Sequence, residues 1–146
     1  MYSTIEDLIN MFGENEIIEI SSVPNVDGLN EEKCYRCLEQ ATAEIDSYIG
    51  MKVAVPLVNY IPDVINRICC NIARYRLYDD KKTPNVQKEY DNEIAFLKDF
   101  RNGLVYINFE NPNSTDADGN PIVNQAKDEV KIKVKAFESS VFSNIF

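Results

Sequence analysis

The chain has 146 residues, a length that fits one domain able to bury most of its apolar surface. It contains no histidine, which excludes the usual general base, the commonest metal ligand and every Ser-His or Cys-His nucleophile. The net charge is −9, and residues 1–50 hold eleven of the 24 acidic residues but two of the 15 basic ones, so binding to nucleic-acid phosphates is disfavoured.

Two short helices are predicted at the start of the chain. The first opens on a capping-box pattern, Ser3-x-x-Glu6, presents apolar residues at helical spacing and ends at Gly13. A second helical segment is expected around residues 16–20. Residues 21–28 follow as a loop, which their Pro, Asn, Asp and Gly content indicates.

Three longer helices are predicted next. One opens at Asn30 and closes at Gly50, another runs from about 63 to 78, and the last begins near Thr83 and stops at Gly103. The first of them carries a single apolar stripe, which consists of Cys34, Leu38, Ala41, Ile45 and Ile49. The sequence therefore predicts a mainly α fold, a small bundle of about four to five helices.

The C-terminal part changes character. Residues 104–109 have strand-like composition, residues 110–126 form a polar loop, and residues 129–137 alternate between apolar residues and lysine with period 2. We expect a long-looped β-hairpin or an extended arm, and we divide the chain into a helical domain, 1–109, and a loop, strand and docking tail, 110–146. The candidate partner contacts are Val130, Ile132, Val134, Phe137, Phe142 and Phe146.

The cysteines raise the question of a metal or redox site. Cys34 and Cys37 have the spacing of half a zinc site, and Cys69 and Cys70 are adjacent. Adjacent side chains on a helix point about 100° apart, however, and zinc pairs normally come from turns. The start MYSTIEDL also lacks the pattern of a secretory signal, so we expect reduced thiols packed in the core and no metal or cofactor.

The segment Asp116-x-Asp118-Gly119-Asn120 resembles part of a calcium-binding loop. A complete loop needs a glutamate at its twelfth position, and this chain has Lys127 there. We interpret the segment as a turn.

The stretch ICCNIARYRLYDD (residues 68–80) predicts one ion pair. Projected on a helix, its isoleucines define a core face, with Arg76 beside that face and Arg74 and Cys70 pointing away. Because an unpaired guanidinium at a core boundary is costly, we predict that Arg76, or less favourably Arg74, pairs with Asp46. The alternative is two exposed charges, and charge reversal at Asp46 is expected to cost more than at Glu44.

Three segments occur in an order and spacing that match a known family. They are YSTIEDLINMFGENEII at 2–18, LEQATAEIDSYIG at 38–50 with AVPL at 54–57, and PDVINRICCNIARYRLYDD at 62–80. Over about residues 2–109 the chain resembles the head–tail joining (connector or adaptor) proteins of Mu-like and other tailed phages and prophages. It departs from the family pattern at Lys52-Val53 and at Asn71.

The resemblance implies a structural role. Such proteins form a ring in the virion, of twelve subunits, between the portal and the tail or its stopper and terminator proteins, and DNA passes through without specific binding. In solution, before the protein meets the portal, a monomer is the alternative. The implied location is the virion, assembled in the bacterial cytoplasm, with no catalytic residues, no cofactor and no membrane contact. The acidic half of the chain would then face the DNA channel or a basic partner.

Two other functional classes remain as alternatives. One is a soluble helical interaction or regulatory module that is not part of a virion. The other is an enzyme that uses a carboxylate pair, although no pair stands out among the 24 acidic residues.

Overall fold

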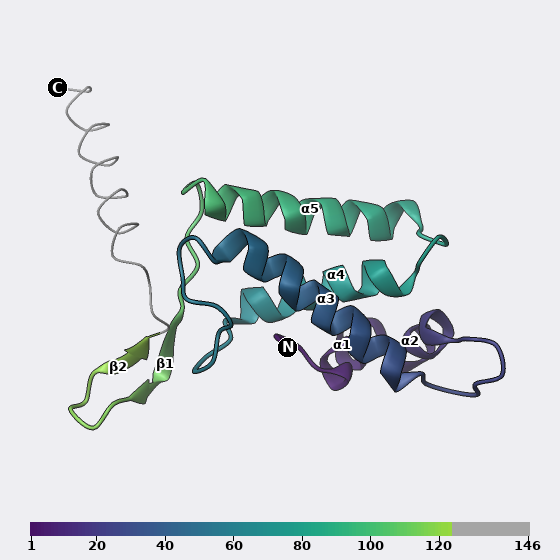
Figure 1. Ribbon diagram of the computed structural model, residues 1–146, viewed down its shortest axis with the longest axis horizontal. Helices are drawn as coiled ribbons and strands as arrows, with labels where there is room; N and C mark the ends of the chain where they lie inside the picture. Colours follow the sequence, from purple (N-terminus) through teal and green to yellow (C-terminus); the bar gives the residue numbers. More distant parts are fainter. Residues whose placement is uncertain (124–146) are drawn as a thin grey trace.

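The computed structural model describes residues 1–123 as a helical bundle with a β-hairpin at one end (Figure 1). Its elements are α1 (Ile5–Phe12), α2 (Glu14–Ser21), α3 (Glu31–Ile49), α4 (Asp63–Leu77), α5 (Pro84–Arg101), β1 (Glu110–Thr115) and β2 (Pro121–Val123). α4 contacts α1, α3 and α5, and α2 packs on α1 and α3. The predicted mainly α class is confirmed.

Local capping sets where the helices begin. The side chain of Asn30 accepts a hydrogen bond from the Lys33 amide, and Thr83 caps α5 in the same way through the amide of Val86. The predicted start of the first helix is wrong by one residue, because Thr4 caps α1. Ser3 is buried instead, since it follows the buried Tyr2 into the core, and the competing Thr4-x-x-Asp7 pattern supplies the box.

The core follows the predicted apolar stripe of α3, whose five members are all buried. On α4 the predicted core isoleucines, Ile65, Ile68 and Ile72, are also fully buried. The prediction that Cys70 points away from the core is wrong, because the N-terminal segment and α1 cover that side of α4. A helix packed on several sides has little exposed face left.

The four thiols are buried and free, as expected of small core residues. Burial raises the pKa of each, and that of Cys70 to about 12, which lowers its thiolate fraction at pH 8 by roughly three orders of magnitude. We therefore expect no reaction of the native protein with Ellman's reagent at pH 8, and four equivalents after unfolding in guanidinium. Rapid labelling of the native protein would contradict the packing of these residues.

The strands differ from the prediction. Residues 104–109 form no strand; Ile107 and Phe109 instead insert into the core, and Phe109 packs against Phe100. The antiparallel hairpin of β1 and β2 lies within residues 110–126, which were predicted to be a polar loop.

The turn at Asp116 explains why the hairpin forms within residues 110–126. The carboxylate of Asp116 accepts hydrogen bonds from the backbone amides of Asp118 and Asn120, so that a local side chain reverses the chain without an apolar strand pattern. The turn interpretation of this segment is thereby confirmed. The predicted strand at 129–137 and the six candidate partner contacts in the tail lie outside the described residues.

Candidate functional site

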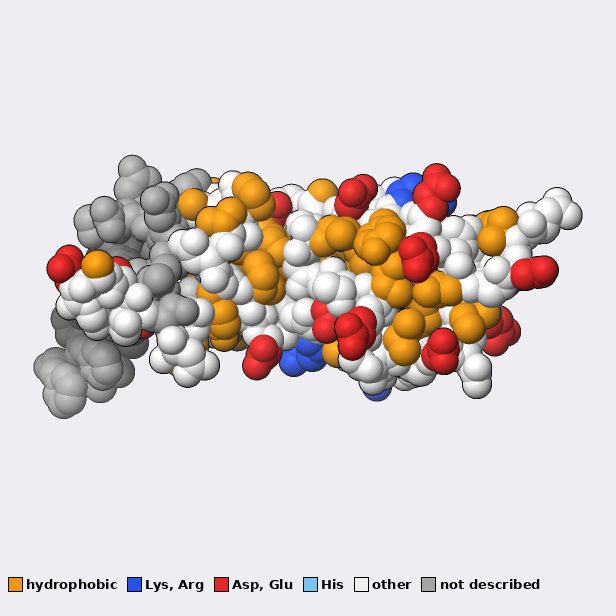
Figure 2. Space-filling view, turned by 90° about the horizontal axis from the view of Figure 1, so that it is seen from below, with side chains coloured by type: hydrophobic (Ala, Val, Ile, Leu, Met, Phe, Trp, Pro, Cys, Tyr) orange, Lys and Arg blue, Asp and Glu red, His pale blue; other side chains and the backbone are white. Residues whose placement is uncertain are grey.

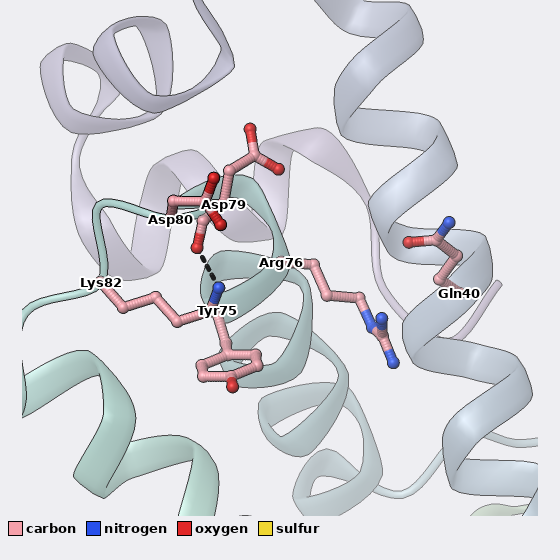
Figure 3. A pocket seen from close by; sticks show the side chains of 6 residues that line it. All are labelled: Gln40, Tyr75, Arg76, Asp79, Asp80 and Lys82. Atoms are coloured by element: carbon pink, nitrogen blue, oxygen red, sulfur yellow. Dashed lines mark hydrogen bonds between the residues drawn. The ribbon is translucent and has the colours of Figure 1, made fainter.

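An open polar depression lies at the C-terminal end of α4, between α3 and the loop that follows α4 (Figure 3). Its lining consists of Gln40, Tyr75, Arg76, Asp79, Asp80 and Lys82. It contains the arginine that the sequence singled out, which makes it the first place to look for function. The charged groups around it decide what it can do.

Arg76 does not pair with Asp46, so that prediction is wrong. Its Nη2 donates to Oε2 of Glu44 at 2.7 Å, and the other oxygen of Glu44 accepts from the Tyr90 hydroxyl at 2.6 Å. Tyr90 in turn stacks on Tyr75, with ring centroids 3.8 Å apart. Glu44 and Asp46 are two residues apart, so their side chains point about 200° apart around α3 and only one can face α4.

Arg74 forms a second ion pair that the sequence did not reveal. Its guanidinium lies 2.6 Å from Oε1 of Glu16 and above the ring of Phe12, at 4.4 Å from the centroid. Tyr78 donates to the same oxygen of Glu16 at 2.7 Å. These contacts fasten α2 to α4. Among eight acidic residues in the first 32 positions, no sequence signal distinguished Glu16.

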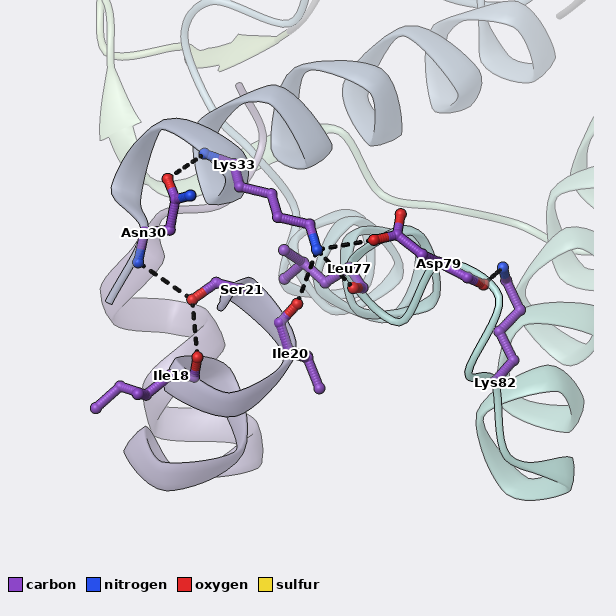
Figure 4. A network of polar contacts seen from close by, with 8 residues as sticks. All are labelled: Ile18, Ile20, Ser21, Asn30, Lys33, Leu77, Asp79 and Lys82. Carbon is purple, nitrogen blue, oxygen red and sulfur yellow. Dashed lines mark hydrogen bonds and ion pairs between the residues drawn. The ribbon is translucent and has the colours of Figure 1, made fainter. Parts of the chain in front are cut away.

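Lys33, a buried lysine, forms a polar cluster with groups from three helix ends and the loop after α4 (Figure 4). Its ammonium donates to the carbonyls of Ile20 at 3.0 Å and Leu77 at 3.3 Å, and to the carboxylate of Asp79 at 2.8 Å. The two carbonyls stand at the C-terminal ends of α2 and α4, where a cation is favoured by both helix dipoles. Lys33 thus joins three helices.

The buried carboxylate of Glu93 on α5 is held by side chains of α4. Arg67 approaches it with two nitrogens at 3.1 and 3.2 Å, and the amide of Asn71 donates at 2.7 Å. Charge-assisted bonds of this kind compensate the cost of burying the carboxylate.

Two of the ionic groups that line the depression, Arg76 and Asp79, hold helices together. Arg76 is bound to Glu44, Asp79 to Lys33, and Lys82 donates to the backbone carbonyl of Asp79. Within residues 1–123 no three histidine, cysteine, aspartate or glutamate side chains converge in a way that could hold a metal ion. The ion-paired side chains at the depression therefore hold neighbouring helices together, and the polar groups at the edge of the depression are suited to polar contacts.

Tyr2 connects the N-terminus to the segment between α3 and α4. Its hydroxyl donates to Asp46 and accepts from the buried Leu57 amide at 2.9 Å. Burial raises the pKa of Tyr2, so that the hydroxyl stays protonated and remains a donor. Asp46, the predicted partner of Arg76, thus positions the residue 51–62 segment instead.

That segment and residues 104–106 form what we call the end surface. They lie side by side at the hairpin end of the bundle (Figure 1). The Lys52 ammonium lies over the Phe100 ring there, 5.1 Å from its centroid. The end surface consists of the exposed Met51 (69%), Val55 (38%), Val58 (78%), Leu104 (71%) and Tyr106 (82%). Figure 2 shows apolar side chains gathered near this end. Apolar side chains grouped in this way are typical of protein–protein contact.

None of the helices in residues 1–123 has both the length and the apolar composition needed to cross a bilayer.

Comparison with known proteins supports the Mu-like phage part of the resemblance. The family model described as Bacteriophage Mu, Gp36 matches residues 2–125. The chain is 31% identical over 115 residues to the Mu-like prophage FluMu protein gp36 of Haemophilus influenzae, with 79% of this chain and 81% of that protein covered. It is 23% identical over 128 residues to Gene product J of Escherichia phage Mu, with 87% and 90% covered.

Proposed function

The chain belongs to the Bacteriophage Mu, Gp36 family of Mu-like phage proteins, and from this premise we propose that it is a structural subunit of the virion. In the proposal it is a head–tail connector or adaptor of a tailed phage or prophage. Copies form a ring, of twelve in the virion, between the portal protein and the tail or its stopper and terminator proteins. The protein is assembled in the host cytoplasm, and DNA passes through the ring without specific binding.

The end surface is the observation that carries this proposal. Four of its side chains are more than two-thirds exposed, and they sit on two segments that the core holds through Val53, Leu57 and Ile107. A rigid scaffold that presents exposed apolar side chains is suited to docking on another protein. We propose that the portal binds this surface. The aromatic residues Phe142 and Phe146, in the C-terminal segment of this chain, would contribute to the same contact.

A non-catalytic role is part of the proposal. Two carboxylates at or near the polar depression serve as helix ties: Glu44 binds Arg76 and Tyr90, and Asp79 binds Lys33. Groups committed to ion pairs of this kind stabilise a scaffold.

Replacing Val58 and Tyr106 with aspartate tests the proposal in the phage or prophage that carries this gene. Both side chains are largely exposed, so we expect the free energy of unfolding to change by about 0.5 kcal/mol or less per substitution. We expect the yield of joined particles to fall at least tenfold, because a charge buried in a docked interface is costly. Electron microscopy of lysates measures separate filled heads and free tails.

The matched control is Val26→Asp, which changes an exposed valine on the loop between α2 and α3. It should leave joining intact. Mass spectrometry of purified particles provides a second measurement, with this chain expected among the virion proteins. A deletion that still yields complete particles lacking the chain would favour the alternative, a helical interaction module outside the virion.

A further inference from the structure

The first two helices present an acidic surface with apolar side chains between the charges. Residues 1–32 contain eight acidic residues and no basic one, and within the described part of the chain only Glu16 among them forms an ion pair. Glu6, Glu14 and Glu19 are exposed on α1 and α2. The same two helices carry the exposed Met11 and several half-buried residues, which are Ile5, Ile9, Phe12 and Ile18.

We call this surface, formed by α1 and α2, the acidic face. In Figure 2 its acidic and apolar side chains lie interspersed over the part of the bundle away from the hairpin. Within residues 1–123, α1 and α2 carry four carboxylates outside ion pairs, those of Glu6, Asp7, Glu14 and Glu19. Like charges this close together repel one another unless a cationic partner lies opposite. The mixture of apolar and acidic groups therefore calls for a partner that is both apolar and basic.

The chain itself contains a segment of that chemistry. Residues 130–137 read VKIKVKAF, in which Val130, Ile132 and Val134 alternate with three lysines and no acidic residue occurs. In an extended conformation successive side chains point to opposite sides, so the segment offers an apolar edge and a row of cations. Charge complementarity of this kind gives specificity and register to an interface.

The place where the described chain ends favours a neighbouring copy, rather than the same copy, as the one that supplies residues 130–137. The described chain ends at Val123 in the hairpin, at the opposite end of the bundle from α2 (Figure 1). A tail that leaves one end of a subunit meets the other end of the next subunit when copies are arranged head to tail. Heterologous contacts of this type generate rings when the rotation closes.

We propose that residues 130–137 of one copy dock on the acidic face of the next copy. Lys131, Lys133 and Lys135 pair there with Glu6, Glu14 and Glu19. The apolar residues of the segment cover the half-buried side chains of α1 and α2. This contact would join neighbouring subunits in the ring proposed above, and only its biological purpose rests on that proposed function. The contact itself can be tested with the purified protein.

A pair of complementary variants of the full chain tests the proposal. The tail variant carries Lys131→Glu, Lys133→Glu and Lys135→Glu, and the face variant carries Glu6→Lys, Glu14→Lys and Glu19→Lys. Each variant alone places like charges on both partners and is expected to remain a 16.7-kDa monomer under conditions in which the wild type associates. Mixed in equal amounts, the two variants restore opposite charges at every contact and are expected to associate again, less strongly as salt is raised.

The control reverses three exposed lysines outside the tail, with Lys81→Glu, Lys88→Glu and Lys98→Glu. It has the same net charge as the tail variant and should associate like the wild type. Mass photometry or light scattering measures the association. A wild type that stays monomeric, or a tail variant that associates like the wild type, would overturn the proposal.

Photo-crosslinking keeps the test valid if the face variant does not fold. Full-length protein with p-benzoylphenylalanine in place of Ile132 is mixed with ¹⁵N-labelled wild type and irradiated. Crosslinks from the unlabelled tail to labelled peptides of residues 1–21 are expected. Crosslinks to unlabelled peptides of residues 1–21 alone, with no labelled counterpart, or no crosslinks to residues 1–21, would contradict docking between copies. Separate virion experiments decide the connector role, so the two proposals fail independently.

Discussion

Replacing Lys33 with methionine is expected to lower the free energy of unfolding by about 2–4 kcal/mol, the larger of the two stability effects we predict. The ammonium is the shared donor to the carbonyls of Ile20 and Leu77, and the thioether of methionine cannot replace it. Methionine keeps most of the volume, so the loss reports on unsatisfied carbonyls rather than on a cavity. Urea unfolding followed by circular dichroism measures it.

Two controls separate the carbonyls from the charge. Lys88→Met removes the same charge from an exposed position and should change stability by about 0.5 kcal/mol or less. Asp79→Asn weakens only the ion pair, whose carboxylate is 65% exposed, and should cost less than about 1 kcal/mol. If Lys33→Met were as mild as Lys88→Met, the helix ends would not depend on this side chain.

Replacing Tyr2 with phenylalanine is expected to cost about 2–3 kcal/mol through the loss of one oxygen atom. The buried amide of Leu57 loses its acceptor, and the carboxylate of Asp46 loses its donor. Tyr106→Phe is the matched control, because that ring is 82% exposed and its change should be near zero. Hydrogen exchange at Leu57 should accelerate in the Tyr2 variant alone.

The Tyr2→Phe deficit also carries a pH signature. Burial raises the pKa of Asp46, whereas the hydrogen bond from the Tyr2 hydroxyl lowers it. Because Tyr2→Phe removes that hydrogen bond, the pKa of Asp46 should be higher in the variant than in the wild type. A raised carboxyl pKa contributes stability at low pH that is lost as pH rises through the folded-state value. The deficit should therefore be smaller below about pH 4 than at neutral pH. A deficit that does not depend on pH would mean that Asp46 is not the group left without a donor.

Comparing the Tyr2 and Lys33 variants also tests the proposed docking surface. Tyr2 holds the segment between α3 and α4, which carries three of the five side chains of the end surface. We expect Tyr2→Phe to weaken partner binding together with stability, and Lys33→Met to act on stability at the other end of the bundle. The comparison separates a local effect on the end surface from general unfolding.

The sequence alone determined the helical architecture. Helix spacing, the Asn30 and Thr83 caps and the apolar stripe of α3 are local properties, because they depend on residues three or four positions apart. The three matched segments, taken together, were also sufficient to place the chain among Mu-like phage proteins, since a family pattern is read directly from residue order.

Which charges meet was decided by the tertiary structure. Glu44 and Asp46 lie two positions apart on α3, and the rotation of that helix relative to α4 selected Glu44 for Arg76 and left Asp46 for Tyr2. The cluster around Lys33 needed the ends of α2 and α4 to converge, although those ends are far apart in sequence. Periodicity fixes the direction of a side chain around its own helix; only packing fixes what stands opposite it.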